Sequence, residues 1–267
     1  MVDRITPRTT EENRATITEK FGVLDLAPVV SESFRQWVLE DNFLAGRPAW
    51  ELQGAQTTTD VARYEKTKMR LLNGGHSAIG YAADLLGYRT IADAVGDPFL
   101  CELLNQFMAE VRPTLEKLPG IDLDSYSASI VKRFSNAAIR DQVARICSGG
   151  SAKIAKFIVP SLVDQLKRGA PSGVASFVIA SWLHYLRGTD ESGRAMDVSD
   201  PGLELMQPFL DAGASDARLA LSVRPLFGDI AFAHPQLVRL VQSALDGLRS
   251  NGVRAALTQT LARVQAR

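Results

Sequence analysis

The sequence predicts a mainly α-helical chain that begins with a short mixed α/β segment. From Val61 onward, apolar residues recur at the three- and four-residue spacing of amphipathic helices. Capping residues mark several helix boundaries in the same region. Before Val61, short β-prone runs and turn residues replace that spacing. We therefore expect an αβ segment over residues 1–61 and a helical domain over residues 62–267.

The first segment should contain one short helix and several extended stretches. Thr9 and Thr10 precede two glutamates in a pattern typical of a helix start, and this helix should run to Phe21. The runs 27–30 and 34–39 are β-prone, and residues 45–48 form a turn signal. Residues 49–59 are then expected to be extended. A region of this size is too small to form a domain alone, so it is expected to be the edge of a larger αβ unit.

The remaining elements follow from periodicity and capping. Asp97-Pro98 and Ser135-Asn136 are expected to start helices, whereas Gly87, Gly169 and Gly188 are expected to end them. The polar stretch 189–201 predicts a surface loop. Helices are expected near 62–86, 89–95, 97–111, 123–132, 136–147, 151–169, 172–187, 201–211, 215–225, 235–250 and 252–265.

Composition excludes several classes of protein. Thirty basic residues balance thirty acidic ones, which argues against a nucleic-acid partner. The sequence contains no run of eighteen apolar residues, so it predicts no membrane span. Its first residues do not resemble a signal peptide. Cys101 and Cys147 suggest no disulfide framework, so we expect a reduced, cytoplasmic setting. His184 lies on an apolar helix, where a core or interface position is expected.

Three polar residues on one predicted helix are candidates for chemistry. With an α-helical repeat, Asn73 lies roughly 140° from Lys68, and His76 lies between them at roughly 80°. An ammonium, a carboxamide and an imidazole fit poorly in an apolar core, because each needs hydrogen-bond partners. Gly74 and Gly75 predict a place where a ligand approaches the backbone. By spacing alone, a solvated polar face remains the alternative.

Lys68, Asn73 and His76 form a Lys-x4-Asn-x2-His pattern that resembles the signature of the mannitol dehydrogenase family, the polyol-specific long-chain dehydrogenases/reductases. Further segments in the same order strengthen the resemblance, and it runs over essentially the whole chain. These segments are Met1-Val-Asp-Arg-Ile-Thr-Pro7, Gln36-Trp-Val-Leu-Glu-Asp41, Gly46-Arg-Pro-Ala-Trp-Glu51, Arg133-Phe-Ser-Asn136 and Ile139-Arg-Asp141.

The resemblance implies a fold and a reaction. The expected fold is the multi-helical substrate domain, similar to the C-terminal domain of 6-phosphogluconate dehydrogenase, preceded by an αβ remnant of a Rossmann domain. The implied activity is the NAD-dependent interconversion of mannitol and fructose. Lys68 would be the general acid/base, Asn73 would stabilise the reacting oxygen, and His76 would orient the substrate. No zinc is needed, and the scattered His and Cys residues show no zinc-ligand spacing.

Three further residues match the family pattern. Arg145 and Lys153 flank Ser148-Gly149-Gly150 and are expected to bind the distal hydroxyls of a polyol or the carboxylate of a sugar acid. Ordinary surface charges on helices are the alternative. Asp3 would tune the pKa of Lys68 electrostatically, unless the chain end simply frays.

The phosphate-binding signature of a dinucleotide domain is missing. The chain has no G-x-G-x-x-G, so NAD or NADP is expected to be bound mainly by a Rossmann domain absent from this chain. A separately encoded Rossmann domain is one expected partner. We expect that the reading frame is truncated, split or mis-started. The isolated chain is then expected to lack dehydrogenase activity on mannitol with NAD. The alternatives are a fructuronate or tagaturonate reductase, a non-catalytic helical remnant acting as a binding module, and an unrelated all-α scaffold with an accidental motif.

Overall fold

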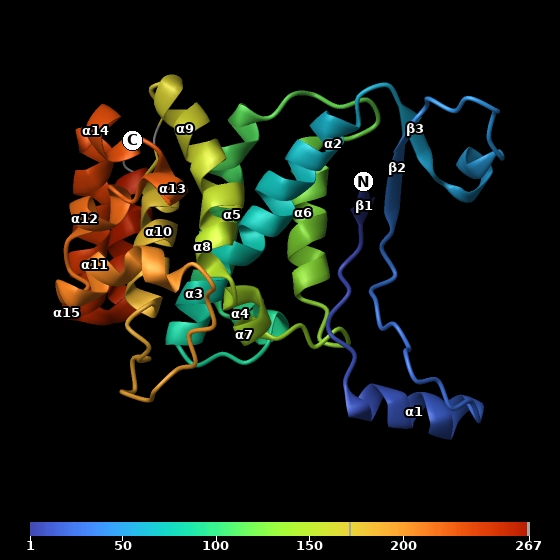
Figure 1. The fold of residues 1–267 in the computed structure, drawn as a ribbon, viewed down its shortest axis with the longest axis horizontal. Helices are drawn as coiled ribbons and strands as arrows, with labels where there is room; N and C mark the ends of the chain where they lie inside the picture. Colours follow the sequence, from blue (N-terminus) through green and yellow to red (C-terminus); the bar gives the residue numbers. More distant parts are fainter. Residues whose placement is uncertain (171, 266–267) are drawn as a thin grey trace.

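The computed structural model describes residues 1–170 and 172–265, and most of them lie in one helical body (Figure 1). The long helices of this body are α3 (Gly74–Leu85), α5 (Pro98–Val111), α6 (Leu123–Phe134), α10 (Gly173–Tyr185) and α15 (Pro235–Gln265). Shorter helices complete it: α2 (Val61–Lys68), α4 (Ile91–Gly96), α7 (Val143–Cys147), α8 (Gly150–Lys153), α9 (Val159–Lys167), α11 (Gln207–Asp211), α12 (Ala217–Leu221), α13 (Arg224–Phe227) and α14 (Ile230–Ala233).

Helices α3 and α10 form the centre of the body. Every residue of α10 from Val174 to Tyr185 is buried, and ten of the twelve residues of α3 are buried. A helix that is apolar on all sides needs neighbours all round, and here α15, α5 and α7 supply them. The helices therefore share one continuous apolar core, which gives the site described below a rigid base.

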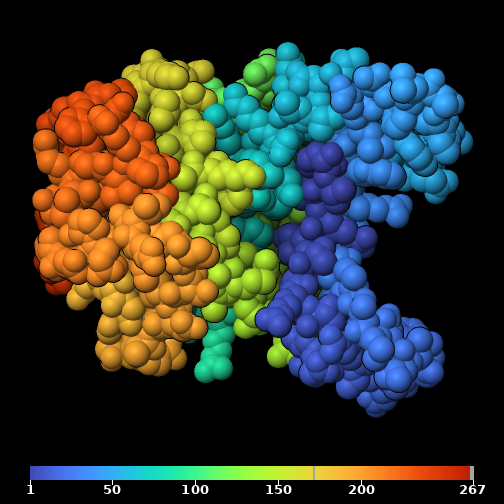
Figure 2. All heavy atoms as spheres, viewed as in Figure 1, coloured from blue at the N-terminus to red at the C-terminus, as the bar shows by residue number. Residues whose placement is uncertain are grey.

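The first sixty residues project from one side of the body (Figures 1 and 2). Helix α1 (Glu11–Phe21) has no buried residue. Strand β2 (Gln36–Glu40) lies between β1 (Val2–Asp3), to which it is antiparallel, and β3 (Gln56–Thr58), to which it is parallel. A 3-10 turn over Trp50–Gln53 precedes β3. We refer to residues 1–60 as the arm.

Most local predictions are confirmed. Thr10 caps α1 through a capping box, and Asp97 caps α5 with Pro98 in its first turn. Gly87, Gly169 and Gly188 all have the positive φ that ends a helix. The predicted break near residue 251 is also present, because Gly252 is non-helical within the α15 span.

Four predictions are wrong. The helix predicted over 215–225 is two short helices, α12 and α13, which are separated at residues 222–223. Residues 27–30 form no strand, and residues 49–59 include a 3-10 turn. The helix predicted over 136–147 is only α7, because Ser135 ends α6 instead of starting a new helix. Residues 136–142 instead form turns and a short backbone pairing, Gln142 with Thr90. The pairing uses the Asp141 carbonyl oxygen and the Val143 N–H, which a continuous helix over 136–147 would need for its own hydrogen bonds.

Candidate functional site

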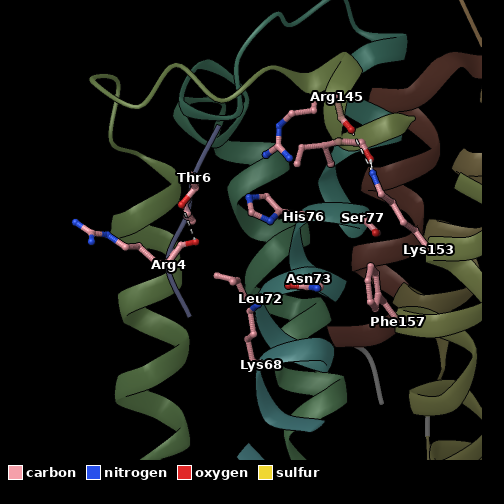
Figure 3. A pocket seen from close by; sticks show the side chains of 12 residues that line it. Arg4, Thr6, Lys68, Leu72, Asn73, His76, Ser77, Arg145, Lys153 and Phe157 are labelled. Atoms are coloured by element: carbon pink, nitrogen blue, oxygen red, sulfur yellow. Dashed lines mark hydrogen bonds between the residues drawn. The ribbon is translucent and has the colours of Figure 1, made fainter. Parts of the chain in front are cut away.

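A polar pocket of about 280 Å³ lies where the arm meets the helical body (Figure 3). The start of the arm forms one wall, the helix that runs through α2 and α3 forms the floor, and α7, α8 and the turn over Ile154–Ile158 form the opposite wall. Its lining residues are Arg4, Ile5, Thr6, Lys68, Leu72, Asn73, His76, Ser77, Arg145, Ile146, Lys153 and Phe157. The structure thus brings together five of the six predicted site residues.

A π-helical turn places Lys68 and Asn73 on the same side of their helix. The helix is not uniformly α: the segment Met69–Asn73 between α2 and α3 is π-helical, and the Gly74 N–H donates to the Met69 carbonyl oxygen. In a π turn, hydrogen bonds join residues five apart, so such residues lie nearer to the same side of the helix than they would in an α-helix. The angle of roughly 140° between Lys68 and Asn73, which assumed an α-helical repeat, is therefore too large. His76, three residues beyond Asn73, continues the same face (Figure 3).

The three side chains of this face have different partners. The half-buried Lys68 ammonium has no hydrogen bond or salt bridge with any described residue. Asn73 donates one Nδ2–H to the Met69 sulfur at 3.2 Å, which leaves its second N–H and its carboxamide oxygen available. The His76 ring stacks on Phe134, with ring centroids 3.9 Å apart. The face therefore presents an unpaired ammonium, a held carboxamide and a held imidazole to the pocket.

The sequence predicts that a ligand approaches the backbone at Gly74 and Gly75, and this explanation of the two glycines is wrong. Gly74 and Gly75 are buried and face α5 instead of the pocket. A Cβ at Gly74 would lie 3.1 Å from the Phe107 ring, and one at Gly75 would lie 3.0 Å from a Leu104 methyl carbon. Glycine is needed here because the helix packs closely against α5.

Arg145 and Lys153 reach the pocket from the opposite wall. Arg145 is on α7, and Lys153 ends α8, immediately before a second π-helical turn over Ile154–Ile158. The Lys153 ammonium donates to the carbonyl oxygens of Ile146 at 2.7 Å and Arg145 at 3.2 Å. These bonds tie Lys153 to the end of α7, so the two cations are held as one unit.

The loop after α10 holds this unit in place. Asp200 accepts hydrogen bonds from the Ser151 backbone N–H at 2.7 Å and from the Ser151 hydroxyl at 2.6 Å. The Gly149 N–H donates to the Ser199 carbonyl oxygen. The start of α8 is thus capped by a segment fifty residues away, which no local sequence rule would show.

Asp3 does not line the pocket and does not fray. It is fully buried, and its carboxylate accepts from the Arg133 guanidinium at 2.7 and 3.1 Å and from the Tyr126 hydroxyl at 2.6 Å. Arg133 also donates to Glu32, whose carboxylate accepts the Ile5 N–H at 2.5 Å. This buried network fastens the stretch Arg4–Thr6, which forms the arm's wall of the pocket.

The pocket is strongly cationic. Arg4, Lys68, Arg145 and Lys153 all line it, and no acidic side chain does. Burial lowers the pKa of Lys153, with a further lowering from Arg145 that the nearby Cys147, Asp141 and Asp200 oppose. Burial also lowers the pKa of His76 well below 6.5, and the surrounding cations Arg145, Arg133, Lys153 and Lys68 add to this effect. His76 is therefore neutral near pH 7.

A second, larger cavity of about 760 Å³ adjoins the first and shares Arg145 and Lys153 with it. Its other side is formed by the arm, with Arg8 and Glu12, and by Arg140, which forms a salt bridge with Glu12 at 3.1 Å. A ligand that extends beyond the first pocket would therefore pass Arg145 and Lys153.

Sequence reasoning selected only five of the twelve lining residues. Arg4 and Thr6 follow Asp3 in a matched segment, and Asp141 ends another, so motif membership was an available signal for them. Phe157 lies in the second π turn and carries no such signal. Over the described residues, no three His, Cys, Asp or Glu side chains cluster so as to hold a metal ion. In the same part of the chain, no helix is both long and apolar enough to cross a bilayer.

Fold and pocket together define a multi-helical domain with a small polar pocket lined by a Lys, an Asn and a His. The sequence profile of the mannitol dehydrogenase C-terminal domain matches residues 60–249, and that of the mannitol dehydrogenase Rossmann domain matches residues 1–52. The chain belongs to the mannitol dehydrogenase family.

Individual relatives agree with this assignment. A mannitol 2-dehydrogenase of Aspergillus fumigatus is 40% identical over 261 residues, which are 96% of this chain and 52% of that protein. Mannitol dehydrogenase 2 of Saccharomyces cerevisiae is 41% identical over 268 residues, which are 99% and 53% of the two chains. The chain thus spans about half the length of the curated relatives it matches.

Two solved structures share the fold. Mannitol 2-dehydrogenase of Pseudomonas fluorescens, in a ternary complex with NAD and D-mannitol, matches with a TM-score of 0.91 and 41% identity, over 98% of this chain and 54% of that one. A substrate-free D-sorbitol dehydrogenase matches with a TM-score of 0.88 and 35% identity, over 96% and 53%. The accidental-motif alternative is therefore wrong.

Proposed function

We propose that this chain supplies the substrate-binding half of an NAD-dependent, metal-independent polyol dehydrogenase that converts mannitol to fructose. The observation that carries the proposal is the unpaired Lys68 ammonium on the same helix face as Asn73 and His76. Family membership and the Pseudomonas fluorescens structure with NAD and D-mannitol support it.

The chemistry needs a base at the hydroxyl that is oxidised. Neutral Lys68 takes the O–H proton while the hydride leaves the same carbon. The Asn73 carboxamide donates a hydrogen bond to that oxygen, which stabilises the negative charge developing on it. In the reverse direction, the ammonium returns the proton. General acid/base catalysis of this kind contributes on the order of 10²- to 10⁴-fold to a rate.

The other predicted residues place the substrate. Arg145 and Lys153 lie where the distal hydroxyls of a bound polyol would reach, and His76 orients the hydroxyl next to the reacting carbon. Asp3 would act on Lys68 only over a distance, because Arg133 and Tyr126 occupy its carboxylate. Its larger contribution is to hold the wall formed by Arg4–Thr6.

NAD, when bound, accepts the hydride. The described residues include no glycine-rich strand–loop–helix turn to hold its pyrophosphate. The residues of this chain therefore fit the alcohol and not the whole dinucleotide. We propose that a Rossmann half, in the same protein or in a separate chain, holds the phosphates, and that the domain boundary lies near residue 61.

Lys68→Ala tests the proposal directly. In the enzyme that joins this chain to a family Rossmann half, turnover of mannitol with NAD is expected to fall by on the order of 10³-fold, because the proton acceptor is lost. Lys66→Ala, on the same helix, is the matched control and is expected to retain activity. Near-normal turnover in the Lys68 variant would remove Lys68 from the role of base.

A second candidate function is a fructuronate or tagaturonate reductase. The observation that favours it is the cationic lining, because Arg145 and Lys153 could bind a sugar carboxylate, whereas the Arg4 guanidinium points away from the pocket (Figure 3). Relative kcat/KM values for mannitol, arabinitol, sorbitol and fructuronate separate the two. A preference for fructuronate of tenfold or more would replace the first proposal.

A further inference from the structure

A buried carboxylate, Asp141, lies between two of the proposed substrate-contacting residues. Its side chain is 5% exposed and accepts a bidentate hydrogen-bond pair from Arg145, with distances of 2.6 to 2.9 Å. Its second oxygen, Oδ2, lies 3.8 Å from Nε2 of His76. One carboxylate therefore faces both the guanidinium and the imidazole.

The backbone around Asp141 is held from both sides. The Asp141 carbonyl oxygen accepts the Ile91 N–H at 2.9 Å, and the Val143 N–H donates to the Arg89 carbonyl oxygen at 2.9 Å. Arg140, immediately before Asp141, has a φ of 51°, a left-handed conformation that is strained for a residue with a side chain. The surrounding contacts maintain this strained turn and keep the carboxylate directed inward.

The imidazole of His76 is held in one orientation. Its ring stacks on Phe134 with an angle of 17° between the planes. Nε2 is fully buried and has no hydrogen-bond partner, so the Asp141 carboxylate is the charged group it faces. Nδ1 has no hydrogen-bond partner among the described residues, and the ring lines the pocket, so Nδ1 is the nitrogen left for a ligand.

A neutral imidazole carries one proton, and its surroundings decide which nitrogen holds it. His76 is neutral because burial and the cations Arg145, Arg133, Lys153 and Lys68 oppose a second proton. A lone pair on Nε2 would face a carboxylate oxygen and be repelled, whereas an N–H there is attracted. The charge of Asp141 thus favours the Nε2–H tautomer.

We propose that Asp141 is a positioning residue that holds His76 as the Nε2–H tautomer and, through the same carboxylate, aims Arg145. Nδ1 then presents a lone pair, so His76 accepts a hydrogen bond and selects a ligand that donates a hydroxyl proton at that point. The substrate hydroxyl rests on the proposed function, but the tautomer does not.

Nitrogen NMR of the ¹⁵N-histidine-labelled chain tests the tautomer without any turnover. The chain has only three histidines, so His76→Gln assigns the signals of His76. At pH 7 the wild-type His76 is expected to show a protonated Nε2 and an unprotonated Nδ1. A protonated Nδ1 in the wild type would overturn the proposal, even if no variant could be folded.

The variant Asp141→Asn keeps the shape and removes the charge. We expect the Nε2–H form of His76 to lose its dominance, because Arg145 takes the carboxamide oxygen and leaves the NH₂ group towards the ring. Asp190→Asn is the matched control, since Asp190 is also buried and forms a salt bridge with an arginine four residues later, Arg194. It should leave the His76 spectrum unchanged. An unchanged His76 spectrum in Asp141→Asn would overturn the role of Asp141.

Activity separates this inference from the proposed function. If the wild type shows the Nε2–H tautomer but the joined enzyme oxidises no polyol, the function fails and the inference stands. If the enzyme is active and Asp141→Asn leaves KM for the polyol unchanged, Asp141 does not position substrate-binding groups. A rise in KM of about tenfold, equivalent to the loss of one hydrogen bond worth roughly 1.4 kcal/mol, is the expected result.

Discussion

The arm and the helical body bury their apolar residues to very different degrees. Ten of the thirteen exposed large hydrophobic side chains lie in the arm, although it is less than a quarter of the chain, and Leu44 and Leu24 are among them. The body buries nearly all of its own. The body therefore has a core that can stabilise it independently, whereas the arm depends on a few specific contacts with the body.

Those contacts combine buried ion pairs with the packing of Ile5 in the main core. The ion pairs of Arg133 with Asp3 and Glu32 are buried, whereas the apolar cluster under β2 contains only Val38, Tyr64 and Leu118 as buried residues. The same ion pairs fix one wall of the pocket. Attachment of the arm and completion of the site are thus one structural event, which the following predictions test.

The largest effect is expected for Arg133→Met. It leaves the buried carboxylates of Asp3 and Glu32 without their cation, so the free energy of unfolding should fall by about 3–5 kcal/mol. Urea titration measures this loss, and limited proteolysis should show earlier cleavage within the arm. Arg254→Met is the control: its partner Asp97 keeps hydrogen bonds from Tyr88 and the Phe99 N–H, so about 1 kcal/mol is expected. Equal losses in both variants would contradict the importance of the arm network.

A pair of leucines should separate the two regions next. Leu104 is 0% exposed in the body, and Leu44 is 106% exposed in the arm. Leu104→Ala should lower the free energy of unfolding by about 2–5 kcal/mol, because it leaves a cavity beside α3. Leu44→Ala should change it by less than about 0.5 kcal/mol. Thermal unfolding of both variants measures the difference. A comparable loss in Leu44→Ala would mean that the arm is packed in solution.

Mild acid should weaken the body through His184. Burial, with help from Arg187 and Arg249, lowers the pKa of His184 from 6.5 to about 4. The unfolded chain therefore binds the proton more readily than the folded chain. The contribution of neutral His184 to the free energy of unfolding is complete above pH 6.5 and is lost as pH falls to about 4. The loss should reach at most about 3 kcal/mol. His184→Gln should flatten the pH dependence of urea unfolding in that window, whereas His234→Gln should not. A parallel shift of both curves would remove His184 as the cause.

The helices were predictable because their signals are local. The capping box at Thr10, the Asp97-Pro98 start and the glycines at 87, 169 and 188 each act within one or two turns of chain. Membership of the pocket by Lys68, Asn73 and His76 was predictable for the same reason, since these residues share one helix. The shortness of α7 was not predictable, because a backbone pairing with residues about fifty positions earlier replaces the hydrogen bonds of a longer helix.

By itself, the sequence determined the helical class, most helix ends and the set of groups with reactive or hydrogen-bonding potential, since these depend on neighbouring residues. Only the tertiary structure decided how those groups are used. The π turn that aligns Lys68 with Asn73, the tie between Lys153 and α7, and the burial of Asp3 against Arg133 all require close packing between distant segments. Packing and desolvation act through space, so no spacing rule along the chain encodes them.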